Sequence, residues 1–180
     1  MAQSINSTDY SFSNSENFSE VYNIARSQVK KIILNFDEDS FFKDFQELFF
    51  GGSNYYKLFM RKKNNIICGT LAYIFDANAF CDIFFWNDEI FKKSTEEFRF
   101  FCEYFFNKTK SFGINNMIVP MDKSRKKHVL FKRYCEILYF SKEQYIFQDK
   151  NLAEEYSNHY LLKVNYENYF NAIAKAKNID

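Results

Sequence analysis

The sequence predicts a single α/β (α+β) domain in which helices and mainly antiparallel strands share one core. Three observations lead to this prediction. The chain has 180 residues, which suits one domain that buries about 70% of the surface its unfolded chain exposes. Segments with a helical spacing of apolar residues alternate with β-rich runs. Aromatic residues make up 21% of the chain, against one proline and four glycines, so the chain is rich in core-forming residues and poor in breakers.

The N-terminal part of the chain predicts two helices. Between residues 18 and 36, apolar residues recur at steps of three and four, which indicates one long amphipathic helix. After "DEDS" we expect a second helix, with Asp39 or Ser40 as its N-cap and a left-handed exit at Gly51-Gly52. Residues 1–17 are rich in serine and asparagine, and we expect a flexible segment or, at "DYSF", an edge strand.

The middle of the chain predicts a three-stranded meander followed by a helix. The runs "NYYKLFMR" and "NIICGTLAYIF" are separated by "KKNN", and a second turn at "DANA" leads into "FCDIFFW". The helix that follows ends at Gly113. Its expected buried face consists of Phe98, Phe101, Cys102, Phe105 and Phe112.

The C-terminal part of the chain predicts more strands and two helices. "NNMIVPM" is typical of a short buried strand, and "KKHVLFKRYCEI" of a short helix. "SKEQYIFQD" and "SNHYLLKV" alternate like antiparallel strands, and "YENYFNAIAKAK" predicts a terminal helix.

Charge and cysteine spacing argue against several classes of function. The net charge of +1 gives the whole molecule no strong attraction to polyanions. The four cysteines show no CxxC spacing and the two histidines are far apart, so we expect reduced core thiols and no metal site. We see no signal peptide and no apolar run of about 18 residues, so we expect a cytoplasmic protein without a membrane span.

The order of these elements resembles the GNAT superfamily of acetyl-CoA-dependent N-acetyltransferases, from about residue 9 to residue 164. Gly69 is similar to the glycine common in the family's third strand, "DIFFW" to its fourth strand, and "KSFGINNMIVPMD" to its passage into the fifth. "VLFKRYCEILYF" looks like the family's tyrosine-bearing helix, with Tyr139-Phe140 where Gly-Phe is usual.

The resemblance implies an architecture and its boundaries. We expect a GNAT-like mixed, mostly antiparallel twisted sheet of six to seven strands with helices on both faces. The expected GNAT-like domain covers residues 18–164, and a C-terminal helix or tail covers residues 165–180.

The loop after the predicted fourth strand departs from the family pattern. In the family it carries Arg or Gln, two residues, Gly, one residue, then Gly or Ala, and its backbone N–H groups hold the coenzyme pyrophosphate. Here it reads "NDEIFKKSTEEF", with Lys92 and Lys93 at the basic and glycine positions. Ser94 and Glu97 form a predicted capping box that would occupy N–H groups a phosphate needs. The charges of Glu96 and Glu97 would repel an anion there.

Site residues are also implied by the resemblance. A base must deprotonate the acceptor amine, and Asp82 and Glu89 are the candidates. An acid must protonate the leaving thiolate, and Tyr134 is the candidate, with Tyr139 as the competing assignment. Surface ion pairs for the carboxylates and ordinary packing for the tyrosines stay open as alternatives.

Acetyl-CoA is the co-substrate that the resemblance implies. We expect it to enter between the fourth and fifth strands, near Phe84–Trp86 and Met117–Val119. The residues expected to bind it are Phe85, Trp86, Lys92, Lys93, Ser94, Thr95 and Lys126.

A basic stretch, "MDKSRKKHVLFKR" at residues 121–133, leaves alternatives open. Cations in the first turn of a helix oppose its dipole, so the stretch is either a solvated basic face or a site for an anion, from a coenzyme or a nucleic acid.

Three functions follow, in order of preference. The first is acetyl transfer from acetyl-CoA by direct attack of an amine. The amine belongs to a small molecule or to a protein. The second is an inactive GNAT-fold binding or structural module, and the third, nucleic-acid binding, is disfavoured. The aromatic final strands leave a homodimer open.

Overall fold

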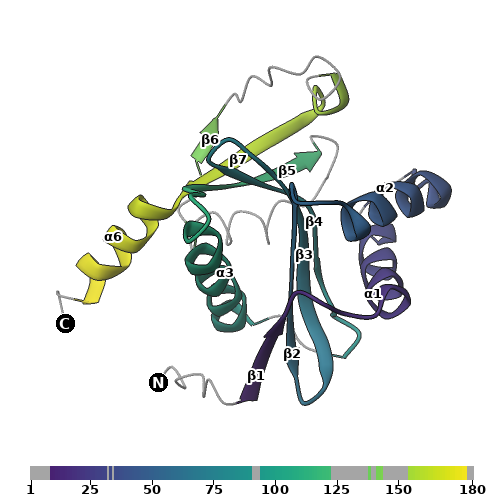
Figure 1. The fold of residues 1–180 in the computed structure, drawn as a ribbon, viewed down its shortest axis with the longest axis horizontal. Coiled ribbons are helices and arrows are strands. Elements are labelled where there is room, and N and C mark those ends of the chain that lie inside the picture. Colours follow the sequence, from purple (N-terminus) through teal and green to yellow (C-terminus); the bar gives the residue numbers. More distant parts are fainter. Residues whose placement is uncertain are drawn as a thin grey trace. The chain divides into compact units, whose positions relative to one another are not determined.

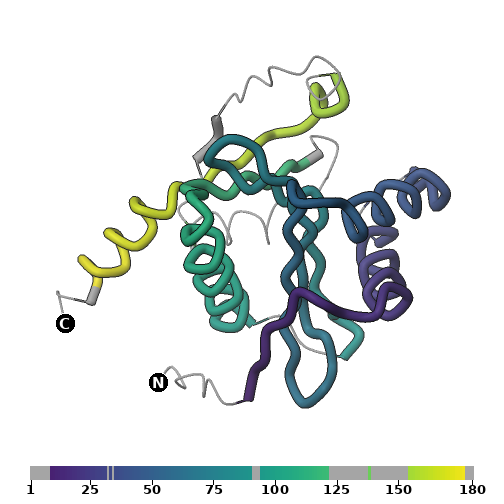
Figure 2. The backbone as a smooth tube through the Cα atoms, viewed as in Figure 1, coloured from purple at the N-terminus to yellow at the C-terminus, as the bar shows by residue number. Residues whose placement is uncertain are grey.

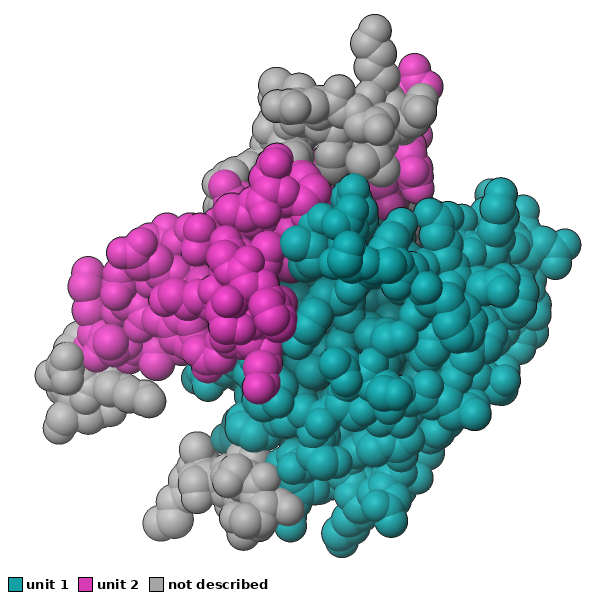
Figure 3. All heavy atoms as spheres, in the orientation of Figure 1, with its two compact units in different colours: residues 1–74, 81–105 teal, residues 75–80, 106–180 magenta. Residues whose placement is uncertain are grey.

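The computed structural model describes residues 9–31, 33, 35–90, 94–122, 138, 141–143 and 154–177. The chain divides into two units (Figure 3). Unit 1 contains residues 1–74 and 81–105, and unit 2 contains residues 75–80 and 106–180.

The described part of the chain contains seven strands and four helices, which are labelled in Figure 1. The strands are β1 (Tyr10–Ser13), β2 (Tyr55–Lys62), β3 (Asn65–Phe75), β4 (Asn78–Trp86), β5 (Asn116–Asp122), β6 (Ser141–Glu143) and β7 (His159–Asn165). The helices are α1 (Phe18–Lys30), α2 (Glu38–Phe50), α3 (Thr95–Lys110) and α6 (Tyr166–Lys177).

The hydrogen-bonded strand order is β1-β2-β3-β4-β5-β7-β6, with β4 shared by the two units. β4 and β5 are parallel, whereas β1–β2, β2–β3, β5–β7 and β6–β7 are antiparallel. Figure 2 traces the long hairpin of β2 and β3. Its turn residues Lys63 and Asn64 have φ of 49° and 68°, as a tight hairpin turn requires.

The helices α1 and α2 differ from the sequence prediction in their ends. α1 ends at Lys30, where Lys31 caps it, so the predicted helix from 18 to 36 is too long. The N-cap of α2 is Asp37 and not Asp39 or Ser40, because the Asp37 carboxylate accepts from the backbone N–H groups of both.

Gly51 ends α2 for a different reason from the one predicted. Its φ of −57° lies outside the left-handed region, so the predicted left-handed exit is wrong. A Cβ at this position would lie 2.2 Å from Cδ2 of Tyr55. Glycine is therefore required by the close approach of the Tyr55 ring, not by backbone conformation.

Helices cover both faces of the strands of unit 1, as predicted (Figure 1). Ile83 and Phe85 of β4 pack in one core cluster with residues of α1 and α2, including Val21 and Phe45. Phe84, between them, points the other way, since alternate strand residues face opposite sides. Its ring lies 5.5 Å from that of Phe98 and 5.6 Å from that of Phe101, both in α3.

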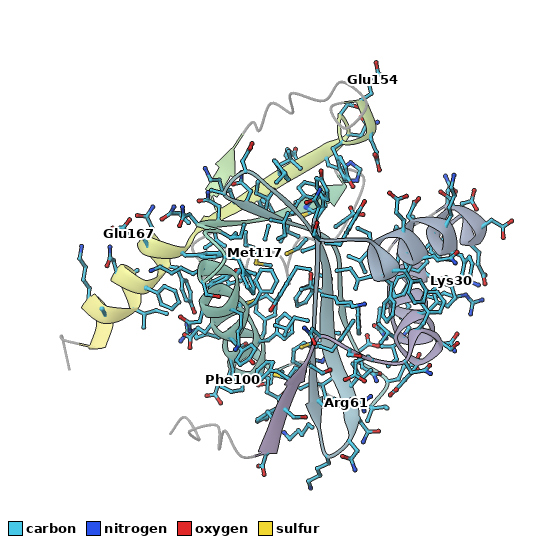
Figure 4. All side chains as sticks on the ribbon, viewed as in Figure 1. Lys30, Arg61, Phe100, Met117, Glu154 and Glu167 are labelled. Atoms are coloured by element: carbon cyan, nitrogen blue, oxygen red, sulfur yellow. The ribbon has the colours of Figure 1, made fainter. Side chains whose placement is uncertain are left out.

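The short strand β1 is held to α3 by aromatic rings. The Phe100 ring lies 5.6 Å from that of Tyr10 and 5.4 Å from that of Phe12 (Figure 4). Phe12 also stacks on Tyr104 at 3.7 Å. The edge strand at "DYSF" is thus packed against a helix rather than isolated.

Unit 2 is organised around β5 and β7, which pair over seven residues each. Three asparagine side chains link its strands: Asn116 Nδ2 donates to Asn78 Oδ1, and Asn165 Nδ2 donates to Asn116 Oδ1, both at 3.0 Å. The predicted terminal helix is present as α6. Its first residue, Tyr166, is buried, and its ring stacks on Phe106 at 4.4 Å.

Two remaining helix predictions have different outcomes. Phe112 was expected on the buried face of the helix at α3, but α3 ends at Lys110 and Phe112 is 68% exposed. The helix predicted at "KKHVLFKRYCEI", residues 126–137, lies wholly outside the described residues. None of the described helices is long and apolar enough to cross a membrane.

Candidate functional site

The end of β4 is the place where the sequence predicts a coenzyme. β4 pairs with β5 over only three residues, and the last pair is Phe80 with Ile118. β4 nevertheless continues to Trp86, and β5 continues to Asp122 in its pairing with β7. The six residues Cys81–Trp86, all in unit 1, have no described pairing with β5.

Asn87 fixes the point where the chain leaves β4. Its backbone N–H donates to the carbonyl of Ile67 at 2.8 Å, and its side-chain Nδ2 donates to the carbonyl of Ile66 at 3.0 Å. Only 3% of Asn87 is exposed. Asn87 is not among the predicted site residues, although a polar residue directly after a buried apolar strand is a signal for it.

The side chains of the predicted β4 residues have distinct surroundings. Phe85 is 2% exposed and packs in the α1/α2 core cluster, so a contribution of this residue to a ligand would come through its backbone. Trp86 is 5% exposed, and its indole Nε1 has no hydrogen-bond acceptor among the described residues. Asp82 is half-buried.

The turn after β4 is tied to the end of α1. Ser27 Oγ donates to Glu89 Oε1 at 2.5 Å, and Lys31 Nζ lies 2.9 Å from Asp88 Oδ1 and 3.6 Å from Glu89 Oε1. The hydrogen bond to Asp88 raises the pKa of Lys31. The candidate base Glu89 is therefore an exposed member of an ion-pair cluster. Lys31, 57 residues before Asp88, could not be found from local sequence.

Of the two hydrogen bonds in the predicted capping box at the start of α3, the structure has the one made by Ser94. Ser94 Oγ accepts from the backbone N–H of Glu97 at 3.3 Å, as predicted. The Glu97 carboxylate, however, accepts from the Tyr10 hydroxyl and from Lys62 Nζ, at 2.5 and 2.8 Å. It is drawn away because Lys62 supplies a positive charge, which a backbone N–H cannot.

The first turn of α3 has backbone N–H groups that Ser94 and Glu97 do not accept from. Among the described residues, no acceptor is present for the backbone N–H groups of Thr95 and Glu96. N–H groups in the first turn of a helix attract anions, whereas the exposed Glu96 carboxylate opposes them.

Several predicted site residues lie outside the described part of the chain. These are Lys92, Lys93, Lys126, Tyr134 and the competing Tyr139. The described members, all in unit 1, are Asp82, Phe85, Trp86, Glu89, Ser94 and Thr95.

Buried thiols next to this site are poor nucleophiles. Burial raises the pKa of Cys81, in β4, to about 12. Burial also raises the pKa values of Cys68 and Cys102 well above their ordinary value. Because the thiolate is the reactive form, these three side chains do not favour a covalent cysteine intermediate. In the described ranges, no group of three or more His, Cys, Asp and Glu side chains is placed to hold a metal ion.

The fold defined by these strands and helices is that of the GNAT acetyltransferases, which confirms the resemblance at the level of fold. One similar structure is the PaiA N-acetyltransferase of Thermoplasma acidophilum in complex with coenzyme A. Its TM-score is 0.62 at 12% identity, over 87% of this chain and 99% of that chain.

Two further structures are similar to the same extent. An acetyltransferase from Streptococcus agalactiae gives a TM-score of 0.62 at 12% identity, over 87% of this chain and 98% of that one. Tetrahymena GCN5 gives a TM-score of 0.61 at 12% identity, over 87% of this chain and 95% of that one. No protein-family model matches the chain, and no curated protein sequence matches it.

Proposed function

We propose that this chain transfers an acetyl group from acetyl-CoA to an amine on a small molecule or a protein. The observation that carries the proposal is the end of β4–β5 pairing at Phe80 and Ile118. In this proposal the amide-bearing arm of the coenzyme lies along β4 beyond that point, in the way an extended peptide adds to a strand edge. The fold and the coenzyme A bound to a similar structure support this assignment.

The phosphate end of the coenzyme lies at the start of α3 in this proposal. The N–H groups of Thr95 and Glu96 would donate to it, and Lys92, Lys93 and Lys126 would supply positive charge. Trp86 would contact the coenzyme beside β4, and its buried Nε1 is a donor with no acceptor among the described residues.

The reaction in this proposal is direct attack. The amine nitrogen forms a bond to the acetyl carbonyl carbon, and the carbon–sulfur bond breaks. Asp82 or Glu89 accepts the amine proton, directly or through water, and Tyr134 protonates the leaving thiolate. The raised pKa values of the three buried cysteines support direct attack over an acetyl-cysteine intermediate.

A catalytically inactive GNAT-fold binding or structural module is the second candidate. Residues 87–95 contain no glycine, and two carboxylates, Asp88 and Glu89, lie in the turn that precedes α3. Lys31 is already paired with both. These features weaken the site for pyrophosphate, and they would not matter in a module that binds no coenzyme.

Two measurements on the full chain separate the candidates. Release of the coenzyme thiol from acetyl-CoA should depend on added amine, tested with a polyamine, an amino acid and a lysine-containing peptide. Acetyl-CoA at 100 times its dissociation constant should stabilise the fold by about 2.7 kcal/mol in thermal unfolding. Stabilisation without thiol release would favour the inactive module with a retained ligand. The absence of both stabilisation and thiol release would overturn the proposal.

A further inference from the structure

The outer side of the α1–α2 pair carries a row of aromatic rings that is not fully buried. Phe42 and Phe50 of α2 are 41% and 62% exposed. Phe18 of α1 lies between them, with ring distances of 5.9 Å to Phe42 and 5.0 Å to Phe50. Tyr22 lies 5.2 Å from Phe42. We refer to Phe18, Tyr22, Phe42 and Phe50 as the aromatic ridge.

The aromatic ridge lies above a core that is complete without its exposed rings. Phe45 and Phe49, on the inner side of α2, are 0% and 4% exposed. Phe42 and Phe50 therefore add exposed apolar area on top of a filled core. A contiguous exposed patch of this kind marks an interaction surface more often than a single exposed side chain does.

Carboxylates of α2 flank the aromatic ridge. Asp39 lies one helical turn before Phe42, and Glu47 lies one turn before Phe50, so each carboxylate neighbours an exposed ring. Burial and the charge of Glu47 raise the pKa of Asp44. Against one lysine, Lys43, the segment from residue 37 to residue 50 carries five carboxylates, at Asp37, Glu38, Asp39, Asp44 and Glu47.

Most of this charge is not neutralised within the described chain. Glu38 pairs with Arg26 at 2.7 Å. Among the described residues, Asp39 and Asp44 form no ion pair with a cation. The surface thus combines exposed aromatic rings with a net negative rim.

We propose that the aromatic ridge is a docking surface for a basic, apolar segment of a partner protein. Apolar side chains of that segment would cover Phe42 and Phe50, and its lysines or arginines would pair with the carboxylates of α2. The complementary charge decides the occupant. A two-fold contact between copies of this chain would bring the same carboxylates together, and anionic membranes or nucleic acids would be repelled.

The test uses a synthetic probe and the full chain. A fluorescent peptide of about 15 residues, with leucine and lysine in helical amphipathic order, represents the basic apolar segment. Its anisotropy should rise on binding, and the affinity should fall with added salt because the rim charges contribute. A peptide with glutamate in place of lysine should not bind.

Variants locate the binding surface. Phe50→Ser should weaken binding by about tenfold or more, as expected for an aromatic anchor. Asp39→Asn with Asp44→Asn should weaken it and reduce the salt dependence. Phe112→Ser is the matched control, because Phe112 is also exposed, at 68%, and lies in unit 2. Since all four side chains are at the surface, circular dichroism should show native helix content.

Three outcomes would overturn the proposal. The first is equal binding of the lysine and glutamate peptides. The second is peptide binding that Phe50→Ser leaves unchanged. The third is no peptide binding together with a dimer in light scattering that Phe50→Ser dissociates, which would assign the aromatic ridge to a second copy of the chain.

Discussion

The Tyr10 hydroxyl donates a hydrogen bond to Glu97 Oε1 at 2.5 Å, across 87 positions of sequence. Lys62 Nζ donates to the same oxygen at 2.8 Å. One carboxylate therefore joins β1, β2 and α3, and only 7% of Glu97 is exposed. The residue that the sequence analysis assigned to a helix cap instead holds the edge strand to the helix.

Removing this carboxylate should destabilise the fold. Glu97→Ala leaves the Tyr10 hydroxyl without its acceptor and Lys62 with only the Tyr10 oxygen. We therefore expect a loss of about 2 kcal/mol in the free energy of unfolding. Urea unfolding followed by circular dichroism measures it. Glu96→Ala, an exposed neighbour in the same turn, is the control and should change stability by less than about 1 kcal/mol. Equal effects of the two substitutions would show that the Glu97 contacts contribute nothing specific.

Stability should decrease in alkaline solution because the buried thiols keep their protons. Burial raises the pKa of Cys81 to about 12, and raises those of Cys68 and Cys102 well above the ordinary 9.0. In the unfolded chain these thiols ionise near their ordinary pKa, so above it the folded state binds more protons than the unfolded state. The contribution of the thiols is thus complete below about pH 9 and is lost as pH rises towards their folded pKa values.

The measurement is the free energy of unfolding from about pH 8 to about pH 10. Cys102→Ala should give a shallower decrease, because one titrating group is removed, whatever its effect on packing at neutral pH. A decrease with the same slope in wild type and variant would assign it to other groups. Lys62 and Tyr10, whose pKa values are also raised, add a decrease of the same sign at higher pH.

Gly69 should tolerate no side chain. A Cβ there would lie 2.5 Å from Cδ1 of Phe59 and 2.7 Å from Cζ of Phe85. Because both rings are buried in the α1/α2 core cluster, Gly69→Ala should cost about 1 to 3 kcal/mol. Gly52→Ala, where a Cβ would meet nothing within 4 Å, is the matched control. Thermal unfolding compares them, and a neutral Gly69→Ala would mean that the rings move aside.

The two candidate bases can be separated by conservative substitution. If Glu89 is the base, Glu89→Gln should lower kcat by about 10² to 10⁴ while acetyl-CoA binding is retained. Asp82→Asn should then have a small effect, and the reverse result would assign the base to Asp82. Glu103→Gln, further along α3 in unit 1, controls for the loss of a carboxylate. If neither variant loses activity, the base lies elsewhere in the chain.

Much of the fold could be predicted from the sequence because each element carries its own periodicity. The hairpin at "KKNN", the strand at "DIFFW" and the helix at "YENYFNAIAKAK" were found from local patterns, and the element order led to the fold. The ends of α1 and α2 were missed because caps depend on which side chain reaches the free N–H groups. Asp37, Asp39 and Ser40 are equally good N-caps by residue type.

Less of the candidate site could be predicted. Ser27 and Lys31 reach Glu89 from α1, and Tyr10 and Lys62 reach Glu97 from β1 and β2. These partners are 35 to 87 positions away in sequence. No local pattern encodes such pairs, because they depend on how strands and helices pack. The place of Asn87 directly after a buried strand is a local signal, but its acceptor, the carbonyl of Ile66 in the neighbouring strand, is not.

The central claim, that the edge of β4 binds the coenzyme arm, is tested most directly by amide hydrogen exchange with and without acetyl-CoA. We predict that exchange in Cys81–Trp86 slows when acetyl-CoA is added, because new hydrogen bonds protect that strand edge, while exchange in the control strand Tyr10–Ser13 changes little. Unchanged exchange across Cys81–Trp86 at saturating acetyl-CoA would contradict the account.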